Sequence, residues 1–145
     1  MLVLQAGWFK IKQAQSQASG NGALVENVSQ AIGALQALGT TATAGNAAKI
    51  IAGGVLTLDL GQVVPADAPI SISLARVDTA RVRVEVSLDG VVFSNKGTFG
   101  SSGTLGTSPL NVLARLVVNA NPGGTQYIRL TREAGSMWVD GAEYS

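Results

Sequence analysis

Apolar and polar residues alternate along several short segments of the second half of the chain. Segment 82–88 alternates Val, Val, Val and Leu with Arg, Glu and Ser, and the same period of two recurs over 56–60, 70–75, 110–118 and 128–130. A period of two is typical of half-buried β-strands. Because these runs are short and separated by Gly, Pro, Asn and Asp, they favour a mainly β protein built as an antiparallel sandwich or barrel.

The clearest hairpin is predicted over 82–93. Its centre, Asp89-Gly90, suits a two-residue type I′ turn. Such a turn pairs Val86 with Phe93, and paired residues share a face of the sheet. The residues expected on one buried face are therefore Val82, Val84, Val86, Leu88, Val91 and Phe93.

The predicted strand 110–118 carries apolar residues on both of its faces. We expect its even-numbered positions to point into the core, while Leu113 and Val117 lie on the opposite face. A strand that is apolar on both faces is covered on both sides. The second cover is either the N-terminal part of the same chain or a neighbouring subunit.

Charge divides the chain into two parts. Between residues 13 and 48 Glu26 is the one charged residue, and charges recur at ordinary density from Lys49 onward. We place the boundary near 50–54, which gives an N-terminal arm over 1–54 and a β-sandwich body over 55–145.

A short helix is predicted within the arm, over 24–38. Val25, Val28, Ile32 and Leu35 are spaced by three, four and three residues, as in a coiled-coil seam. A helix of this length does not persist alone in water. It packs on its own body or on a partner, and both alternatives stay open. If the arm is an attachment segment, the body is expected to fold without residues 1–50.

The N-terminal tip is apolar, and ordering it requires contacts with the body or with another chain. Together with the arm and the outward face of 110–118, it supplies the predicted partner contacts. These are Leu2, Leu4, Trp8, Phe9, Val25, Val28, Ile32, Leu35, Leu113 and Val117.

Composition removes most catalytic chemistry. The chain has no cysteine and no histidine, so thiolate nucleophiles, Ser-His pairs and His or Cys metal sites are excluded. The glycine-rich stretches "GNAAK" and "GSSGTLG" do not match a phosphate-binding loop. We therefore predict no enzyme activity, no catalytic residue, no cofactor and no metal.

Carboxylates are the remaining candidates for chemistry. Asp140 and Glu143 lie three residues apart on a predicted strand, which places their side chains on opposite faces and disfavours acid–base work. A calcium site using Asp59 and Asp140 is a weaker alternative to ordinary surface carboxylates.

Charge gives no pull towards nucleic acid or membrane. Ten basic and nine acidic residues leave a net charge of +1. Four arginines, at 81, 83, 129 and 132, form a small basic patch if their strands adjoin, but Glu85 and Glu133 dilute it. The chain shows no secretory signal and no run of about 20 apolar residues, so we expect a soluble protein without a membrane span.

Three stretches resemble a known fold family. "VRVEVSLDGVVFSNKG" resembles the central hairpin of galactose-binding-like jelly rolls, which include discoidin domains and several carbohydrate-binding modules. "QYIRLTREAGSMWVDGAEYS" resembles the closing strands of that fold, and "VLTLDLG" resembles an opening strand. The resemblance spans roughly 55–145 and implies an antiparallel jelly-roll β-sandwich.

The resemblance implies two classes of function. Similar jelly rolls occur in small bacteriophage virion proteins, often as trimers. An arm joined to such a body resembles a capsid decoration or fibre-type protein. The first prediction is therefore a virion protein that is assembled in the bacterial cytoplasm and self-associates as a homotrimer. Its N-terminal arm is expected to attach it to other virion proteins such as the major capsid protein. The alternative is a carbohydrate-binding module, for which the body offers few aromatic residues.

Overall fold

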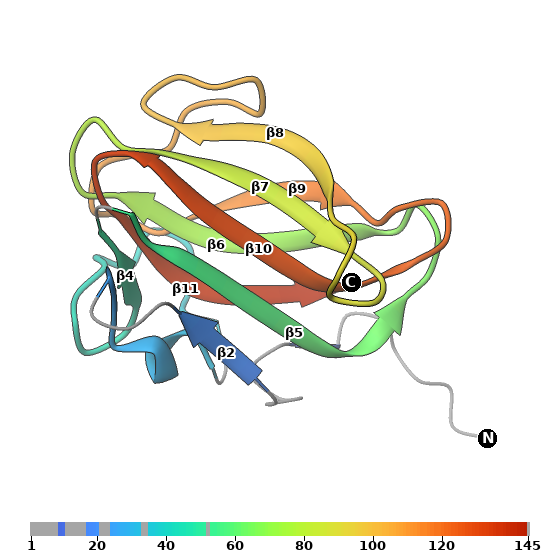
Figure 1. The fold of residues 1–145 in the computed structure, drawn as a ribbon. Coiled ribbons are helices and arrows are strands. Elements are labelled where there is room, and N and C mark those ends of the chain that lie inside the picture. The colour runs from blue at the N-terminus through green and yellow to red at the C-terminus, as the bar shows by residue number, and fades with distance from the viewer. Residues whose placement is uncertain (1–8, 11–16, 21–23, 33–34, 52, 145) are drawn as a thin grey trace.

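The chain folds into a jelly-roll β-sandwich, as the alternation and the resemblance predict (Figure 1). The computed structural model describes residues 9–10, 17–20, 24–32, 35–51 and 53–144, with the backbone alone for the first two ranges. The strands are β1 (Phe9–Lys10), β2 (Gln17–Gly20), β3 (Val25–Glu26), β4 (Ala48–Ile50), β5 (Val55–Val64), β6 (Pro69–Arg76), β7 (Arg81–Ser87), β8 (Ser94–Gly100), β9 (Ala114–Asn119), β10 (Thr125–Ala134) and β11 (Met137–Tyr144), and a 3-10 helix, η3, spans Val28–Ala31.

Two antiparallel sheets form the layers of the sandwich. The five-stranded sheet has the order β2-β5-β10-β7-β8. The six-stranded sheet has the order β3-β4-β11-β6-β9, with β1 paired to β11. Figure 1 shows β5, β10 and β7 in front of β11, β6 and β9. The last two strands of the chain, β10 and β11, therefore lie in the middle of the two sheets.

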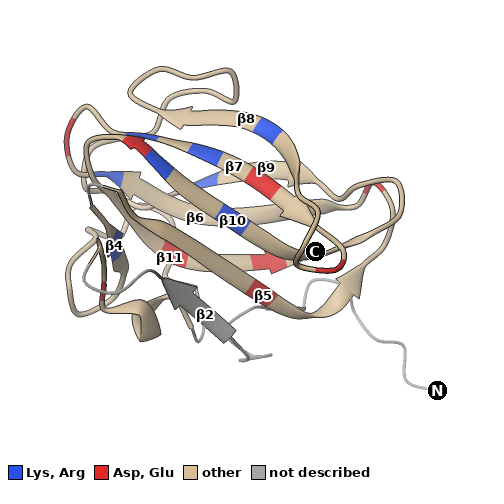
Figure 2. Cartoon of the chain, viewed as in Figure 1, with Lys and Arg blue, Asp and Glu red and all other residues tan. Residues whose placement is uncertain are grey.

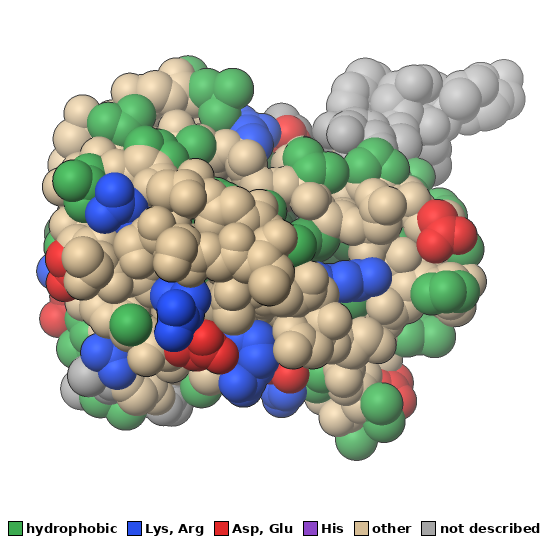
Figure 3. Space-filling view, turned by 90° about the horizontal axis from the view of Figure 1, so that it is seen from above, with side chains coloured by type: hydrophobic (Ala, Val, Ile, Leu, Met, Phe, Trp, Pro, Cys, Tyr) green, Lys and Arg blue, Asp and Glu red, His purple; other side chains and the backbone are tan. Residues whose placement is uncertain are grey.

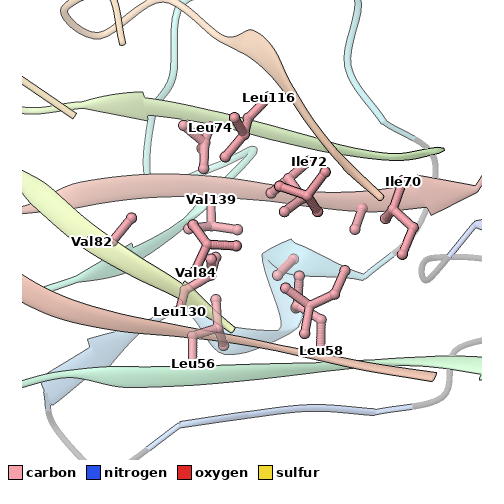
Figure 4. Close-up of a cluster of buried hydrophobic side chains, with 14 of the residues drawn as sticks. Leu56, Leu58, Ile70, Ile72, Leu74, Val82, Val84, Leu116, Leu130 and Val139 are labelled. Carbon is pink, nitrogen blue, oxygen red and sulfur yellow. The ribbon is translucent and has the colours of Figure 1, made fainter. Parts of the chain in front are cut away.

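The core lies between the sheets and consists of the residues that alternation places inward. Leu58 and Leu130 from the five-stranded sheet meet Ile72 and Val139 from the six-stranded sheet (Figure 4). All four side chains are fully buried. The predicted inward positions of 56–60, 70–74, 82–86 and 128–130 are confirmed as core.

The predicted hairpin register is wrong beyond Val86. β7 ends at Ser87 and β8 begins at Ser94, so that Val86 pairs with Ser94 and not with Phe93. A register shift between Val84 and Glu85 then brings a later aromatic residue, Phe99, opposite Val82. Phe99 is the buried aromatic of this hairpin.

The cause is the side chain of Asp89. Its Oδ1 accepts the backbone N–H groups of Val91 at 2.9 Å and Val92 at 3.0 Å, which replaces the tight turn by a loop over 88–93. Leu88 and Val91 are consequently exposed, contrary to their predicted burial.

The described part of the N-terminal segment packs on the sandwich without forming the predicted helix over 24–38. Val25 lies in β3, which pairs with β4. Asn27 has a φ of +54°, and Ile32 is extended, so that a single 3-10 turn lies between them. Val25 is buried in the core, and Val28 packs against it. The predicted boundary at 54 falls between β4 and β5, which belong to different sheets.

The strand predicted over 110–118 begins only at Ala114. Asn111 has a φ of +54°, which interrupts the alternation before β9. Leu110 and Val112 are therefore exposed, although their even parity predicts burial. Leu116 and Val118 lie in the core as expected.

No helix in the part of the chain that the structure describes is long and apolar enough to cross a membrane.

Candidate functional site

The outer face of the five-stranded sheet gathers aromatic, charged and amide side chains. Ile128 and Leu130 of β10 point into the core, so Tyr127 and Arg129 point outward. Tyr127 lies opposite a residue of β5 on one side and a residue of β7 on the other. Figure 2 shows charged positions on β5, β7 and β10, the adjacent strands of this face.

Arg129 is fixed by two neighbours. Its Nε donates to Glu85 Oε1 at 2.9 Å. Its guanidinium carbon lies 3.9 Å from the centroid of the Phe93 ring, in a cation–π contact. The hydrogen bond from Arg129 holds the pKa of Glu85 below its ordinary value, against the opposing effect of burial. The carboxylate, the guanidinium and the ring thus form a pre-arranged group.

A chain of ion pairs continues from this group along β7 and β10. Arg83 lies 3.5 Å from Glu85 and 3.6 Å from Glu133, and Arg81 lies 3.2 Å from Glu133. The strands that carry these arginines adjoin, and the glutamates neutralise them, as the sequence predicts. Basic and acidic side chains lie side by side in Figure 3. The face therefore offers paired charges and no strong field of one sign.

Arg132, the fourth predicted member of the basic patch, does not join this chain of ion pairs. Its Nε donates to the carbonyl oxygen of Gly135 at 2.8 Å. It stabilises the turn between β10 and β11.

The part of this face that β5 forms carries a single charged residue, Asp59. Gln126 Nε2 donates to Asp59 Oδ1 at 3.0 Å, which orients the amide. Tyr127 is half-buried, and a Cβ atom placed on Gly90 would lie 3.3 Å from its ring. The 88–93 loop therefore packs against Tyr127. Tyr127 and Phe93 both stand where the loop meets the sheet.

The outer face of the six-stranded sheet holds the two C-terminal carboxylates. Asp140 points outward by alternation from the core residue Val139, and the bulge between Val139 and Gly141 shifts the parity of the later residues so that Glu143 points outward as well. Asp140 Oδ2 accepts the backbone N–H of Gln36 at 2.8 Å, and Arg115 donates both to Glu143 and to the carbonyl of Gln36. The prediction that Asp140 and Glu143 lie on opposite faces is wrong, because both carboxylates flank Gln36. Asp140 holds the segment around Gln36 directly, and Glu143 holds it through Arg115.

The alternative calcium site at Asp59 and Asp140 is not formed. Asp59 is on β5 of the five-stranded sheet, and Asp140 is on β11 of the other sheet. Among the residues that the structure describes, no three His, Cys, Asp or Glu side chains gather as metal ligands.

The predicted partner contacts divide into several groups. Leu2, Leu4 and Trp8 lie outside the described residues, and only the backbone of Phe9 is described, in β1. Val25 is buried, and Val28, Ile32 and Leu35 are partly buried. Whether any of them touches a partner stays a prediction.

Leu113 and Val117 differ in exposure. Leu113 is 1% exposed, because Ala42, Ala75 and Trp138 cover it within the same chain. Val117 is 54% exposed on β9. Of the pair, Val117 is the residue that a second chain can reach.

Sequence reasoning missed the group of Phe93, Arg129 and Glu85. Alternation does place Glu85 and Arg129 outward, since each lies between two core residues. The missing information was the pairing of β7 with β10, because the 37 residues that lie between Ser87 and Thr125 leave no local signal for it. The wrong hairpin register hid Phe93.

Comparisons with known proteins agree with this fold. No family model matches the chain, and no curated protein matches it. Among solved structures, a family 29 carbohydrate-binding module matches with a TM-score of 0.52 at 12% identity, over 89% of this chain and 90% of the module. A mutant family 29 module matches with a TM-score of 0.52 at 10% identity, over 90% and 92%. A third, a mutant module complexed with cellulohexaose, has a TM-score of 0.50 at 11% identity, over 88% and 92%.

At such identities the likeness defines the fold. The chain is a jelly-roll β-sandwich of the kind found in carbohydrate-binding modules, which confirms the fold that the resemblance implied.

Proposed function

We propose that this protein is a non-catalytic carbohydrate-binding module that holds a saccharide on the outer face of the five-stranded sheet. The observation that carries the proposal is the joint placement of Phe93 and Tyr127 beside the Arg129–Glu85 pair. This replaces the virion protein as the leading hypothesis and takes up the alternative that the sequence left open.

The chemistry of the face suits a sugar ring. A pyranose has an apolar face of C–H groups and a rim of hydroxyl groups. Aromatic rings attract polarised C–H groups through their negative faces. Arg129 and Gln126 supply N–H donors, while Glu85 and Asp59 supply acceptors, and each is already oriented by a neighbour. Pre-arranged side chains lose little entropy when a ligand binds.

The paired charges favour a neutral ligand. Arg81, Arg83 and Arg129 are each within 3.6 Å of a glutamate oxygen. An anionic or cationic ligand gains little from a face on which opposite charges already neutralise each other. Neutral hydroxyl groups can join the existing hydrogen bonds without breaking an ion pair.

Similar proteins support the same class of ligand. The modules compared above share the fold along nine-tenths of the chain, and one of them was solved with cellulohexaose. The absence of histidine and cysteine, and the structural use of Asp140 and Glu143, support binding without turnover.

The test is calorimetric titration of the protein with a panel of neutral oligosaccharides that includes cellulohexaose. We expect Phe93→Ala and Tyr127→Ala each to weaken binding at least tenfold. Val117→Ser, on the other sheet, is the matched control and should bind as the parent does. If no member of the panel binds, or if both aromatic variants bind unchanged, the proposal fails.

Self-association remains a second hypothesis, favoured by the exposed Val117 on β9. Trimer formation, attachment to a major capsid protein and location in a virion stay predictions from the sequence. Light scattering on the purified chain tests the first of these, because a monomer at micromolar concentration excludes a stable trimer.

A further inference from the structure

We propose that the loop over 88–93 selects saccharides that carry acetamido groups over unsubstituted saccharides with the same backbone. The inference rests on the proposed function, because it concerns the same face. It names a ligand chemistry that the paired charges of the sheet do not explain.

An apolar rim stands at the loop end of the sheet. We define it as Val63, Leu88, Val91 and Val92, which are 50%, 44%, 79% and 72% exposed. A Cβ atom built on Gly124 would lie 2.8 Å from Val63 Cγ1 and 3.8 Å from Leu88 Cδ1. Both side chains therefore lie close to Gly124. Contiguous exposed apolar side chains mark a contact surface more often than isolated ones do.

The loop holds this rim outward by a network of hydrogen bonds. Asp89 Oδ1 accepts the N–H groups of Val91 and Val92 and the hydroxyl of Ser87. Ser87 Oγ in turn accepts the N–H of Gly90 at 2.8 Å. The two valines therefore project from a backbone whose N–H groups are satisfied within the loop.

The rim adjoins the aromatic part of the candidate site. Gly90 of the loop packs against the Tyr127 ring, and Phe93 at the end of the loop stacks on Arg129. Val91 and Val92 lie between Gly90 and Phe93 in the chain, so we expect a sugar lying on Tyr127 or Phe93 to bring its substituents within reach of these two valines.

The acetamido group is the common sugar substituent that suits this arrangement. It carries a methyl group, which gains from contact with valine, and it is neutral, as the paired charges require. Burying one methyl group strengthens binding by about fourfold. The carboxylate of Asp89, at the tip of the same loop, disfavours an anionic lipid surface as the occupant.

Two oligosaccharides isolate the effect. Chitohexaose and cellulohexaose have the same length and the same linkage and differ in the acetamido group at each ring. We expect the parent to bind chitohexaose at least fourfold more tightly. We expect the double variant Val91→Ser/Val92→Ser to lose this preference while its affinity for cellulohexaose stays unchanged. Both valines are exposed, so the variant should melt at the parent's temperature.

Several results would overturn the inference. Equal or weaker binding of chitohexaose by the parent would do so, and cellulohexaose binding would then leave the proposed function standing. A double variant that keeps the preference would show that the loop is not the selector. A double variant that lowers the mass in solution would assign the rim to contacts between copies. If neither sugar nor any member of the wider panel binds, the proposed function fails as well.

Discussion

Arg129 stacks on Phe93 on the solvent side of the five-stranded sheet, with 3.9 Å between the guanidinium carbon and the ring centroid. Phe93 is therefore a surface aromatic, and Phe99 fills the core position of the same hairpin. We expect Phe93→Ala to lower the free energy of unfolding by about 1 kcal/mol. The matched change Phe99→Ala should lower it by about 3–5 kcal/mol. Urea denaturation measures both, and a loss above about 3 kcal/mol for Phe93→Ala would contradict its surface position.

Glu85 should give the protein a carboxylate-dependent stability. The hydrogen bond from Arg129 lowers the pKa of Glu85 below its ordinary value of 4.5, so the folded state favours the ionised form. The contribution is present above pH 4.5 and is lost as pH falls through the lowered pKa. We expect Glu85→Gln to be less stable than the parent by about 1–2 kcal/mol at pH 7.

The difference between Glu85→Gln and the parent should shrink as the solution is acidified below pH 4.5. Denaturation curves from pH 7 to pH 3 follow it. Glu26→Gln, at an exposed position, is the control and should track the parent. A difference that is independent of pH would exclude the ion pair as its cause.

The 88–93 loop should loosen in acid. The N–H groups of Val91 and Val92 lower the pKa of Asp89 below its ordinary value of 3.8, followed by the hydroxyl of Ser87. The folded loop favours the carboxylate, so its hydrogen bonds persist above pH 3.8 and weaken as pH falls through the lowered pKa. The protection factors of the Val91 and Val92 amides, which compare their exchange with that of an unprotected amide at the same pH, should fall over that range.

Two variants of Asp89 separate the acceptor from the charge. Asp89→Asn keeps a side-chain oxygen and should protect the two amides at neutral pH. Asp89→Ala removes the acceptor and should expose them at every pH. Equal protection in Asp89→Ala would mean that the backbone alone sets the loop.

Deleting residues 1–50 should unfold the protein. The arm hypothesis expects the body to survive this deletion, but the deletion removes β4, which pairs with β11. It also removes Ile50, which is fully buried, and Ala48 beside it. We expect no cooperative thermal melt by circular dichroism. The milder change Ile50→Ala should lower the free energy of unfolding by about 2–5 kcal/mol. A truncated chain that melts like the parent would restore the arm as a separate segment.

Leu113 and Val117 should behave differently when each is changed to Asp. Leu113→Asp places a charge in a covered apolar site and should destabilise the fold strongly. Val117→Asp changes an exposed position and should leave the melting temperature within a few degrees of the parent. If the chain self-associates through β9, Val117→Asp should also lower its mass in light scattering. A Val117→Asp variant that is folded and keeps an oligomeric mass would exclude this face.

Alternation along the chain predicted the sandwich because burial sets the parity of each strand independently. The burial of Ile72 and Val84 can be predicted from the alternation of apolar and polar residues immediately on either side of each. Phe93 was assigned wrongly because a side chain, Asp89, competes with the backbone turn that the Asp-Gly pair otherwise favours.

The helix predicted over 24–38 failed for a different reason. The spacing of Val25 and Val28 fits a helix, but β-branched residues also suit a strand, and β4 offers a partner for Val25. Such a tertiary contact cannot be inferred from spacing. The candidate site likewise depends on the pairing of β7 with β10, which only the folded chain reveals.

The central positions of β10 and β11 have a consequence for biosynthesis. β5 and β7 cannot join until β10 lies between them, and β4 and β6 cannot join until β11 does. A ribosome makes these two strands after all the others described, so the growing chain exposes the unpaired edges of its earlier strands until translation passes residue 144. Folding of this sandwich therefore waits for its two central strands and depends on contacts distant in sequence. Until then, those open edges are the part of the molecule on which another chain could add a strand.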